Sequence, residues 1–168
     1  GMHINISMAK DGKNVFCDES DKNGLSSTAY SFIAGIMEHI KGMTAITNPL
    51  VNSYKRLVPG FEAPVYISWS ASNRSALIRV PAARGMATRV ELRSADPSCN
   101  PYLEMALCIA AGLDGIKKGM KAPEGVTTNI YDMTNEERKA NGIENLPSTL
   151  QEATREFEKS DFVKSVLG

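Results

Sequence analysis

Arginine side chains gather in one part of this 168-residue sequence. Six of its eight arginines lie between Asn48 and Asp96, a stretch that also contains Glu62 and Glu91. A guanidinium group is planar, stays charged and binds carboxylates and phosphates through paired hydrogen bonds. We therefore expect a site that holds several anionic groups together, with the two glutamates placed for metal binding or proton transfer. The six arginines are Arg56, Arg74, Arg79, Arg84, Arg89 and Arg93.

The pattern of residues 88–94 predicts a strand with a charged face. Arg89, Glu91 and Arg93 share one side, and the residues between them are apolar. Alternating charges are ordinary on an exposed strand face and unusual on a buried one, so this pattern alone favours an exposed ladder. The neighbouring arginines and the acidic loop reduce the weight of that interpretation.

The other elements around this strand can be predicted from period and turn residues. Two prolines and a glycine in residues 58–64 place Glu62 on a loop. Strands at 65–70 and 75–80, with a turn at 71–73, indicate an antiparallel hairpin. Residues 2–8 alternate strictly, which predicts a strand with His3, Asn5 and Ser7 on one face, and solvent is the simplest neighbour for a polar strand face. A turn at 10–13 leads into a second short strand, 14–17.

Two helices are expected to form the core. Spacing of apolar residues predicts a helix over 26–41, stopped by Gly42 and followed by a short helix over 43–47. A second long helix is expected over 102–119. Its buried stripe is predicted to contain Leu103, Ala106, Leu107, Ala110, Leu113 and Ile116.

These elements predict an α+β fold. A curved antiparallel sheet, built from strands near 3–8, 14–17, 65–70, 75–80 and 88–94, surrounds the site, and the two long helices pack behind it. Residues 1–120 form the core of the domain, and residues 121–168 form a helical C-terminal tail that lies on the surface. We assign no chemistry to the tail.

Composition excludes several classes of protein. A net charge of zero and a pI near 6.9 argue against a general nucleic-acid or membrane-surface binder. No apolar run approaches the about 20 residues that cross a bilayer. The three cysteines form no CxxC pair, so buried or free thiols in a reducing cytoplasm are expected.

Several segments together resemble one family. The chain is similar to the C-terminal part of the catalytic domain of bacterial type I glutamine synthetases. The resemblance rests on six separated groups of residues in the family's order, at 1–3, 48–57, 59–64, 73–79, 89–93 and 96–102. On this resemblance, residues 1–120 are a fragment of the catalytic-domain core.

The resemblance implies an activity. The family makes glutamine from glutamate, ammonia and ATP: ATP phosphorylates the side-chain carboxylate of glutamate, and ammonia then displaces phosphate. Bringing a carboxylate to a triphosphate requires cations and metal ions, which accounts for the arginine excess. The family also implies Mg²⁺ or Mn²⁺ and a homo-oligomer whose active sites are shared between subunits.

The resemblance also implies roles for individual residues. His3 and Glu91 resemble metal ligands, and Arg56 and Arg93 resemble the clamp on glutamate. Arg74 and Arg79 resemble the phosphate-binding pair, with Arg74 on the transferring phosphoryl group. Glu62 resembles the acidic residue of a flap that closes over the intermediate and takes a proton from the attached ammonium. Nucleotide contacts are implied for Ser7, Asn5, Arg74, Arg79 and Arg89.

Three departures from the family pattern matter. Asn5 stands where some relatives have a second histidine. Tyr131 lies near the position that is adenylylated in some type I enzymes, but its surroundings differ, so we expect no such control here. The family's N-terminal domain, with further metal ligands and the ammonium site, is not in the sequence. We therefore expect residues 1–168 alone to be inactive.

Other functions remain open on the sequence. A γ-glutamyl ligase that uses another amine would show the same residues. A relative that binds nucleotide without catalysis is a second alternative, although the retained set Arg56, Glu62, Arg74, Glu91 and Arg93 argues against it. A plain surface patch of arginines predicts no particular spacing and would leave the six segments as coincidence.

Overall fold

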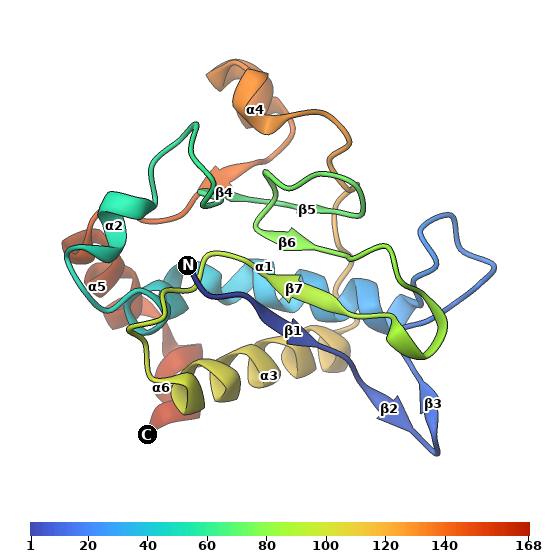
Figure 1. The fold of residues 1–168 in the computed structure, drawn as a ribbon. Helices are drawn as coiled ribbons and strands as arrows, with labels where there is room; N and C mark the ends of the chain where they lie inside the picture. Colours follow the sequence, from blue (N-terminus) through green and yellow to red (C-terminus); the bar gives the residue numbers. More distant parts are fainter.

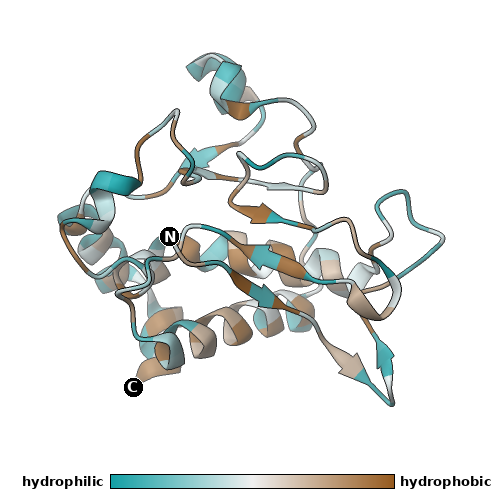
Figure 2. Cartoon of the chain, viewed as in Figure 1, coloured by the Kyte–Doolittle hydropathy of each residue, from teal (hydrophilic) through white to brown (hydrophobic).

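A computed structural model describes all residues, 1–168, and confirms the α+β class (Figure 1). Helices α1 and α3 lie side by side behind the sheet. Figure 2 shows hydrophobic segments on α1 and on the facing strands, whereas α4 is largely hydrophilic. The strands are β1 (Ile4–Ile6), β2 (Ala9–Lys10), β3 (Lys13–Asn14), β4 (Tyr66–Ile67), β5 (Trp69–Ser70), β6 (Ile78–Arg79), β7 (Val90–Leu92) and β8 (Glu144–Asn145). The α-helices are α1 (Ser27–Thr47), α2 (Ser53–Arg56), α3 (Pro101–Lys118), α4 (Asn135–Ala140), α5 (Leu150–Lys159) and α6 (Asp161–Leu167), with 3₁₀ turns at η1 (Gly85–Ala87) and η2 (Ile130–Asp132).

The main sheet has the order β1-β7-β6-β5, so β7 is an inner strand and β1 is an edge. Strand β7 runs antiparallel to both neighbours. Its register places Glu91 opposite Asn5 on one side and opposite Arg79 on the other. Three separate parts of the sequence therefore meet at one level of the sheet.

The predicted antiparallel hairpin is wrong. Strands β5 and β6 pair in parallel, with Trp69 opposite Ile78. The connecting segment loops away from the sheet because its polar groups bind elsewhere: Ser70 Oγ donates to the carbonyl of Val126, and Asn73 Nδ2 donates to the carbonyl of Thr128. Those acceptors lie more than 50 residues further along the chain, so a local turn pattern gave no sign of them.

The predicted second strand at 14–17 also differs from the structure. Strand β3 covers only Lys13–Asn14 and pairs with β2 alone, outside the main sheet. The turn between them has positive φ at Asp11 and Gly12, which is typical of a tight hairpin. Strands β4 and β8 form a third small ladder, so the sheet is smaller than predicted and not fully antiparallel.

Helix α1 continues through Gly42 as one helix to Thr47. The predicted break at Gly42, between a helix over 26–41 and a short helix over 43–47, is therefore wrong. Gly42 serves close packing instead of a stop. A Cβ built there would lie 2.7 Å from Cβ of Ser160, at the junction of α5 and α6. The missing side chain lets this junction pack directly against α1.

Glycines also set the contact between α1 and α3. A Cβ on Gly35 would lie 2.1 Å from the carbonyl oxygen of Ala111, and one on Gly115 would lie 2.1 Å from that of Ser31. The two backbones therefore touch at this crossing, and any larger residue would force them apart.

The predicted buried stripe of α3 is only partly correct. Leu107 is fully buried, but Leu103 and Leu113 are 39% and 36% exposed. The close approach to α1 selects the face with small side chains, which turns several large apolar residues outward. The residues buried on α3 are Glu104, Leu107, Cys108, Ala111, Gly112 and Gly115.

The tail contributes to the core. Ile130, Ala153 and Val163 are fully buried, and β8 pairs with β4 of the core region. A tail that lies on the surface was therefore the wrong description. A boundary near residue 120 stays a prediction. No helix of the chain is both long and apolar enough to cross a membrane.

Glu104 is a fully buried carboxyl at the start of α3. Cys99 Sγ donates to one of its oxygens, and the other has no partner. Burial raises the pKa of Glu104, and the thiol contact opposes this only partly. The folded chain therefore keeps this proton at pH values where the unfolded chain releases it, so stability falls as pH rises from about 4.5 through the raised folded pKa.

We predict that Glu104→Gln removes this pH dependence and stabilises the chain at pH 8, by about 1 kcal/mol, because no charge is then buried. Urea unfolding at pH 5 and pH 8 measures both effects. Glu158→Gln, at an exposed position of α5, is the control. A loss of stability at pH 8 in Glu104→Gln would contradict the assignment of a costly buried carboxylate.

Candidate functional site

Glu91 lies at the centre of the charged cluster that the sequence indicated. Its side chain is almost fully buried, with 5% of its surface exposed. Strand β7 holds it between Asn5 of β1 and Arg79 of β6. Val90 and Leu92, on the opposite face, pack in the hydrophobic core and fix the orientation of the strand. The exposed-ladder interpretation of this strand is therefore wrong at Glu91.

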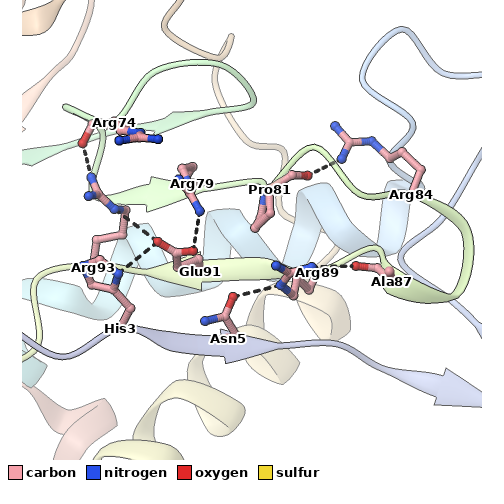
Figure 3. Close-up of polar contacts among 10 residues, drawn as sticks. All are labelled: His3, Asn5, Arg74, Arg79, Pro81, Arg84, Ala87, Arg89, Glu91 and Arg93. Atoms are coloured by element: carbon pink, nitrogen blue, oxygen red, sulfur yellow. Dashed lines mark hydrogen bonds and ion pairs between the residues drawn. The ribbon is translucent and has the colours of Figure 1, made fainter.

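Three side chains meet the Glu91 carboxylate (Figure 3). Arg79 Nη2 lies 2.9 Å from Oε2, and Arg93 Nε lies 3.2 Å from Oε1. His3 Nδ1 lies 3.3 Å from Oε1. Two guanidinium charges against one carboxylate leave the cluster positive, which favours a further anion beside it.

Arg93 links this cluster to the loop that carries Arg74. Its side chain is 6% exposed, and Nη1 donates to the carbonyl oxygen of Arg74. The same guanidinium therefore binds the carboxylate of β7 and fixes the backbone of the 71–77 loop. Arg93 therefore holds the loop that carries Arg74 close to Glu91 of β7.

His3 is chemically suited to bind a metal ion. Burial lowers its pKa, and the charge of Arg93 lowers it further. At neutral pH the imidazole is therefore uncharged, the form that coordinates metals. His3 and Glu91 fit a site for Mn²⁺ or Mg²⁺, with nitrogen favouring Mn²⁺. No group of three or more His, Cys, Asp or Glu side chains gathers anywhere in residues 1–168, so this pair supplies only part of a ligand set.

The residues implied as nucleotide contacts lie beside this cluster. Arg89 Nε donates to Asn5 Oδ1 at 3.0 Å, which joins β1 to the segment before β7. Ser7 is exposed on the same face of the first strand as Asn5. The structure therefore brings Asn5 and Arg89 into contact, next to Glu91, and leaves Ser7 at the end of that row.

Arg56 occupies a different place. Its Nη2 donates to the carbonyls of Ser94 and Ala95 at 2.5 and 2.8 Å, and more weakly to Asn48 Oδ1 at 3.4 Å. Burial lowers the pKa of Arg56, and nearby Asp96 opposes this. In this structure Arg56 braces the chain just after β7 and does not line the cleft described next.

Glu62, Arg74 and Arg93 line one open cleft of about 470 Å³. Its walls come from four segments of the chain, and the lining residues are Gly60, Phe61, Glu62, Asn73, Arg74, Ser75, Arg93, Asn129 and Tyr131. Glu62 and Arg74 are exposed in it. Their side chains have no hydrogen bond or ion pair within the chain, so both are free to meet a ligand. A larger hollow of about 660 Å³, beside the start of α1, contains none of the predicted site residues.

Sequence reasoning missed two residues of this cleft. Asn129 and Tyr131 belong to the tail, to which no chemistry was assigned. The run of family-like residues around Tyr131 is the available signal, and it points to a modification site rather than to a cleft residue. The close packing of η2 against the main domain, with Ile130 fully buried, brings both residues to the cleft.

We predict that Glu91→Gln destabilises the chain by about 2–3 kcal/mol, because Arg93 is buried and Arg79 is partly buried beside it, and both lose their counter-charge. Chemical denaturation of residues 1–168 measures this. Glu62→Gln, which changes the same group at an exposed position, should stay within about 0.5 kcal/mol. Equal effects of the two substitutions would show that the Glu91 cluster is not a buried ion network.

Known proteins of one family are similar to this chain over its whole length. The family model described as "Glutamine synthetase, catalytic domain" matches residues 1–168. Glutamine synthetase of Clostridium saccharobutylicum is 62% identical over all 168 residues, and that of Staphylococcus aureus strain MW2 is 54% identical. In both cases the chain spans 38% of the relative's length.

Solved structures agree. The structure titled "GmaS/ADP complex-Conformation 1" matches with a TM-score of 0.85 and 37% identity, over 99% of this chain and 38% of the other. The one titled "Apo GmaS without ligand" matches with a TM-score of 0.81 and 36% identity, over 99% and 37%. Because the family model matches every residue, the chain belongs to the glutamine synthetase family, within whose catalytic domain it lies.

Proposed function

We propose that residues 1–168 are part of an enzyme that joins ammonia to glutamate with ATP, through γ-glutamyl phosphate. One observation carries this proposal: in a chain of this family, a single cleft joins an unpaired acid, Glu62, to the unpaired Arg74 and to Arg93 of the Glu91 cluster. The chain spans 38% of the curated relatives, so the activity is proposed for the whole protein.

Arg74 is the cation best placed to meet the transferring phosphoryl group. The guanidinium groups of Arg79 and Arg93 are already held by Glu91, whereas that of Arg74 has no partner in the chain. An unpaired charge fixed at an open cleft stabilises negative charge that develops during phosphoryl transfer. Its backbone carbonyl accepts a hydrogen bond from Arg93, so the point from which this side chain extends is held at the cleft.

Glu62 is suited to take a proton from the attached ammonium. It lies on an exposed loop between Pro59 and Pro64. No donor in the chain occupies its carboxylate oxygens, so they are available to accept a proton. A carboxylate at the mouth of the cleft both excludes water when the loop closes and accepts the proton. Arg93 and Arg56 are proposed to bind the carboxylates of glutamate, which requires Arg56 to exchange its carbonyl partners for the ligand.

A metal ion and the nucleotide are proposed to bind beside Glu91. His3 and Glu91 would hold Mg²⁺ or Mn²⁺, which when bound neutralises phosphate charge. The nucleotide is proposed to contact Asn5 and Ser7 of the first strand, together with Arg79 and Arg89. The similarity to a solved ADP complex supports nucleotide binding.

The proposed enzyme is a homo-oligomer in the cytoplasm, as the family resemblance implies. Its cysteines are free thiols, which suits a reducing compartment. We also propose that residues 1–168 alone make no glutamine, because His3 and Glu91 are too few ligands for the metal ions of the reaction.

We predict that the full-length protein forms glutamine and ADP from glutamate, ammonia and ATP, and that residues 1–168 do not. Coupled measurement of ADP release and glutamine, with ammonia and with methylamine compared, tests the amine. ATP turnover with methylamine but not with ammonia would identify a ligase for another amine. Nucleotide binding with no turnover would identify a non-catalytic relative.

We predict that Arg74→Ala in the full-length protein lowers kcat by about two to three orders of magnitude, as expected for the loss of a transition-state charge partner. Arg155→Ala, on the exposed face of α5, is the matched control and should leave kcat unchanged. An unchanged kcat with a raised KM for ATP would assign Arg74 to ground-state binding instead.

A further inference from the structure

The hydroxyl of Tyr131 bridges the backbone on both sides of Glu62. Its oxygen lies 2.9 Å from the carbonyl oxygen of Phe61 and 3.3 Å from that of Ala63. A phenol carries one hydrogen, so the two carbonyls share a three-centre hydrogen bond. We propose that Tyr131 is a positioning residue: it latches the Glu62 loop (residues 58–63) in place at the cleft. The catalytic consequence rests on the function proposed above.

The Glu62 loop has little else to hold its backbone. Within it, the amide of Phe61 donates to the carbonyl of Val58 at 3.4 Å, and Val58 donates to Arg56 nearby. Apart from these local contacts, the Tyr131 bonds are the only hydrogen bonds between the Glu62 loop and the rest of the chain. The side chain of Phe61 is 69% exposed and gives no apolar anchor, so the only buried apolar side chain of the loop is that of Ala63, at its end. Loss of the phenol oxygen would therefore free the segment that carries the acid.

Tyr131 itself stands on a firm base. Ile130, its neighbour in η2, is fully buried, and Asn129 Oδ1 accepts from the amide of Tyr131. The ring of Tyr131 packs against that of Tyr66, with centroids 5.7 Å apart, and Arg138 lies over the Tyr66 ring at 4.8 Å. A rigid donor thus joins the buried end of the loop, at Ala63, to its exposed part, at Phe61, which is the arrangement that a latch requires.

The surroundings of the Tyr131 hydroxyl keep it protonated, so that it can donate a hydrogen bond. Burial raises the pKa of Tyr131, and Tyr66 and Glu62 raise it further, while Arg93 opposes them. The hydroxyl therefore keeps its hydrogen at neutral pH. Because a shared hydrogen bond is weak in net terms, the latch is also weak enough to release the loop when ligand enters or leaves.

Hydrogen exchange of residues 1–168 tests the latch without any assumption about activity. Tyr131→Phe keeps the ring and its packing on Tyr66 but removes the donor. Because the amide of Phe61 is the one that donates a hydrogen bond within the loop, we expect it to exchange about fivefold faster, with α1 unchanged. Tyr102→Phe removes the same oxygen at a position that is 84% exposed, and it should change nothing. Unchanged exchange in the Glu62 loop, or equal acceleration in α1, would overturn the latch.

Kinetics of the full-length protein test the catalytic consequence. We expect Tyr131→Phe to lower kcat by about tenfold, since Glu62 is then misplaced, with the KM for ATP unchanged. A merely structural role would instead reduce the amount of folded enzyme and leave kcat per active site unchanged, which would overturn the positioning role. If the unsubstituted protein forms no glutamine, the proposed function fails, and the exchange experiment still decides whether the latch exists.

Discussion

The burial of one carboxylate, that of Glu91, constrains the charged side chains that meet at the candidate site. A carboxylate with 5% of its side chain exposed must be paired, because an isolated buried charge is strongly unfavourable. Arg79 and Arg93 supply the opposite charges, and His3 adds a polar contact. Arg79 lies on β6, His3 immediately precedes β1 and Arg93 immediately follows β7, so the sheet order and the ion network require each other. Charge pairing thereby fixes where the arginines can point.

The same network separates two kinds of cation. Arg79 and Arg93 are neutralised in part by Glu91, and they hold structure as well as charge. Arg74 is unpaired, yet its backbone is tied to Arg93, so a free charge is carried on a fixed support. For the proposed phosphoryl transfer, this division leaves one guanidinium group available to an anion while its neighbours stay paired.

The outer wall of the cleft depends on the last third of the chain. The β4–β8 ladder and the burial of Ile130 bring η2 against the main domain, and with it come Asn129 and Tyr131. The parallel pairing of β5 with β6 has the same origin, since the loop between them binds the carbonyls of residues 126 and 128. A segment without obvious chemistry in its composition thus shapes both the Arg74 loop and the Glu62 loop.

The sequence by itself determined the elements whose signal is local and the residue types needed for anion chemistry. The alternation of β1 and β7, the long helix expected over 102–119, and the loop position of Glu62 all follow from patterns within a few residues. Family resemblance added the roles, which stay proposals. Only the tertiary structure decided that Gly42 is a packing position inside α1, which face of α3 is buried and that β5 and β6 run parallel. It also decided that Arg56 braces residues 94–95 and that Tyr131 bonds to the backbone of the Glu62 loop. Each of these depends on contacts between residues far apart in the chain, and no local period or turn signal encodes them.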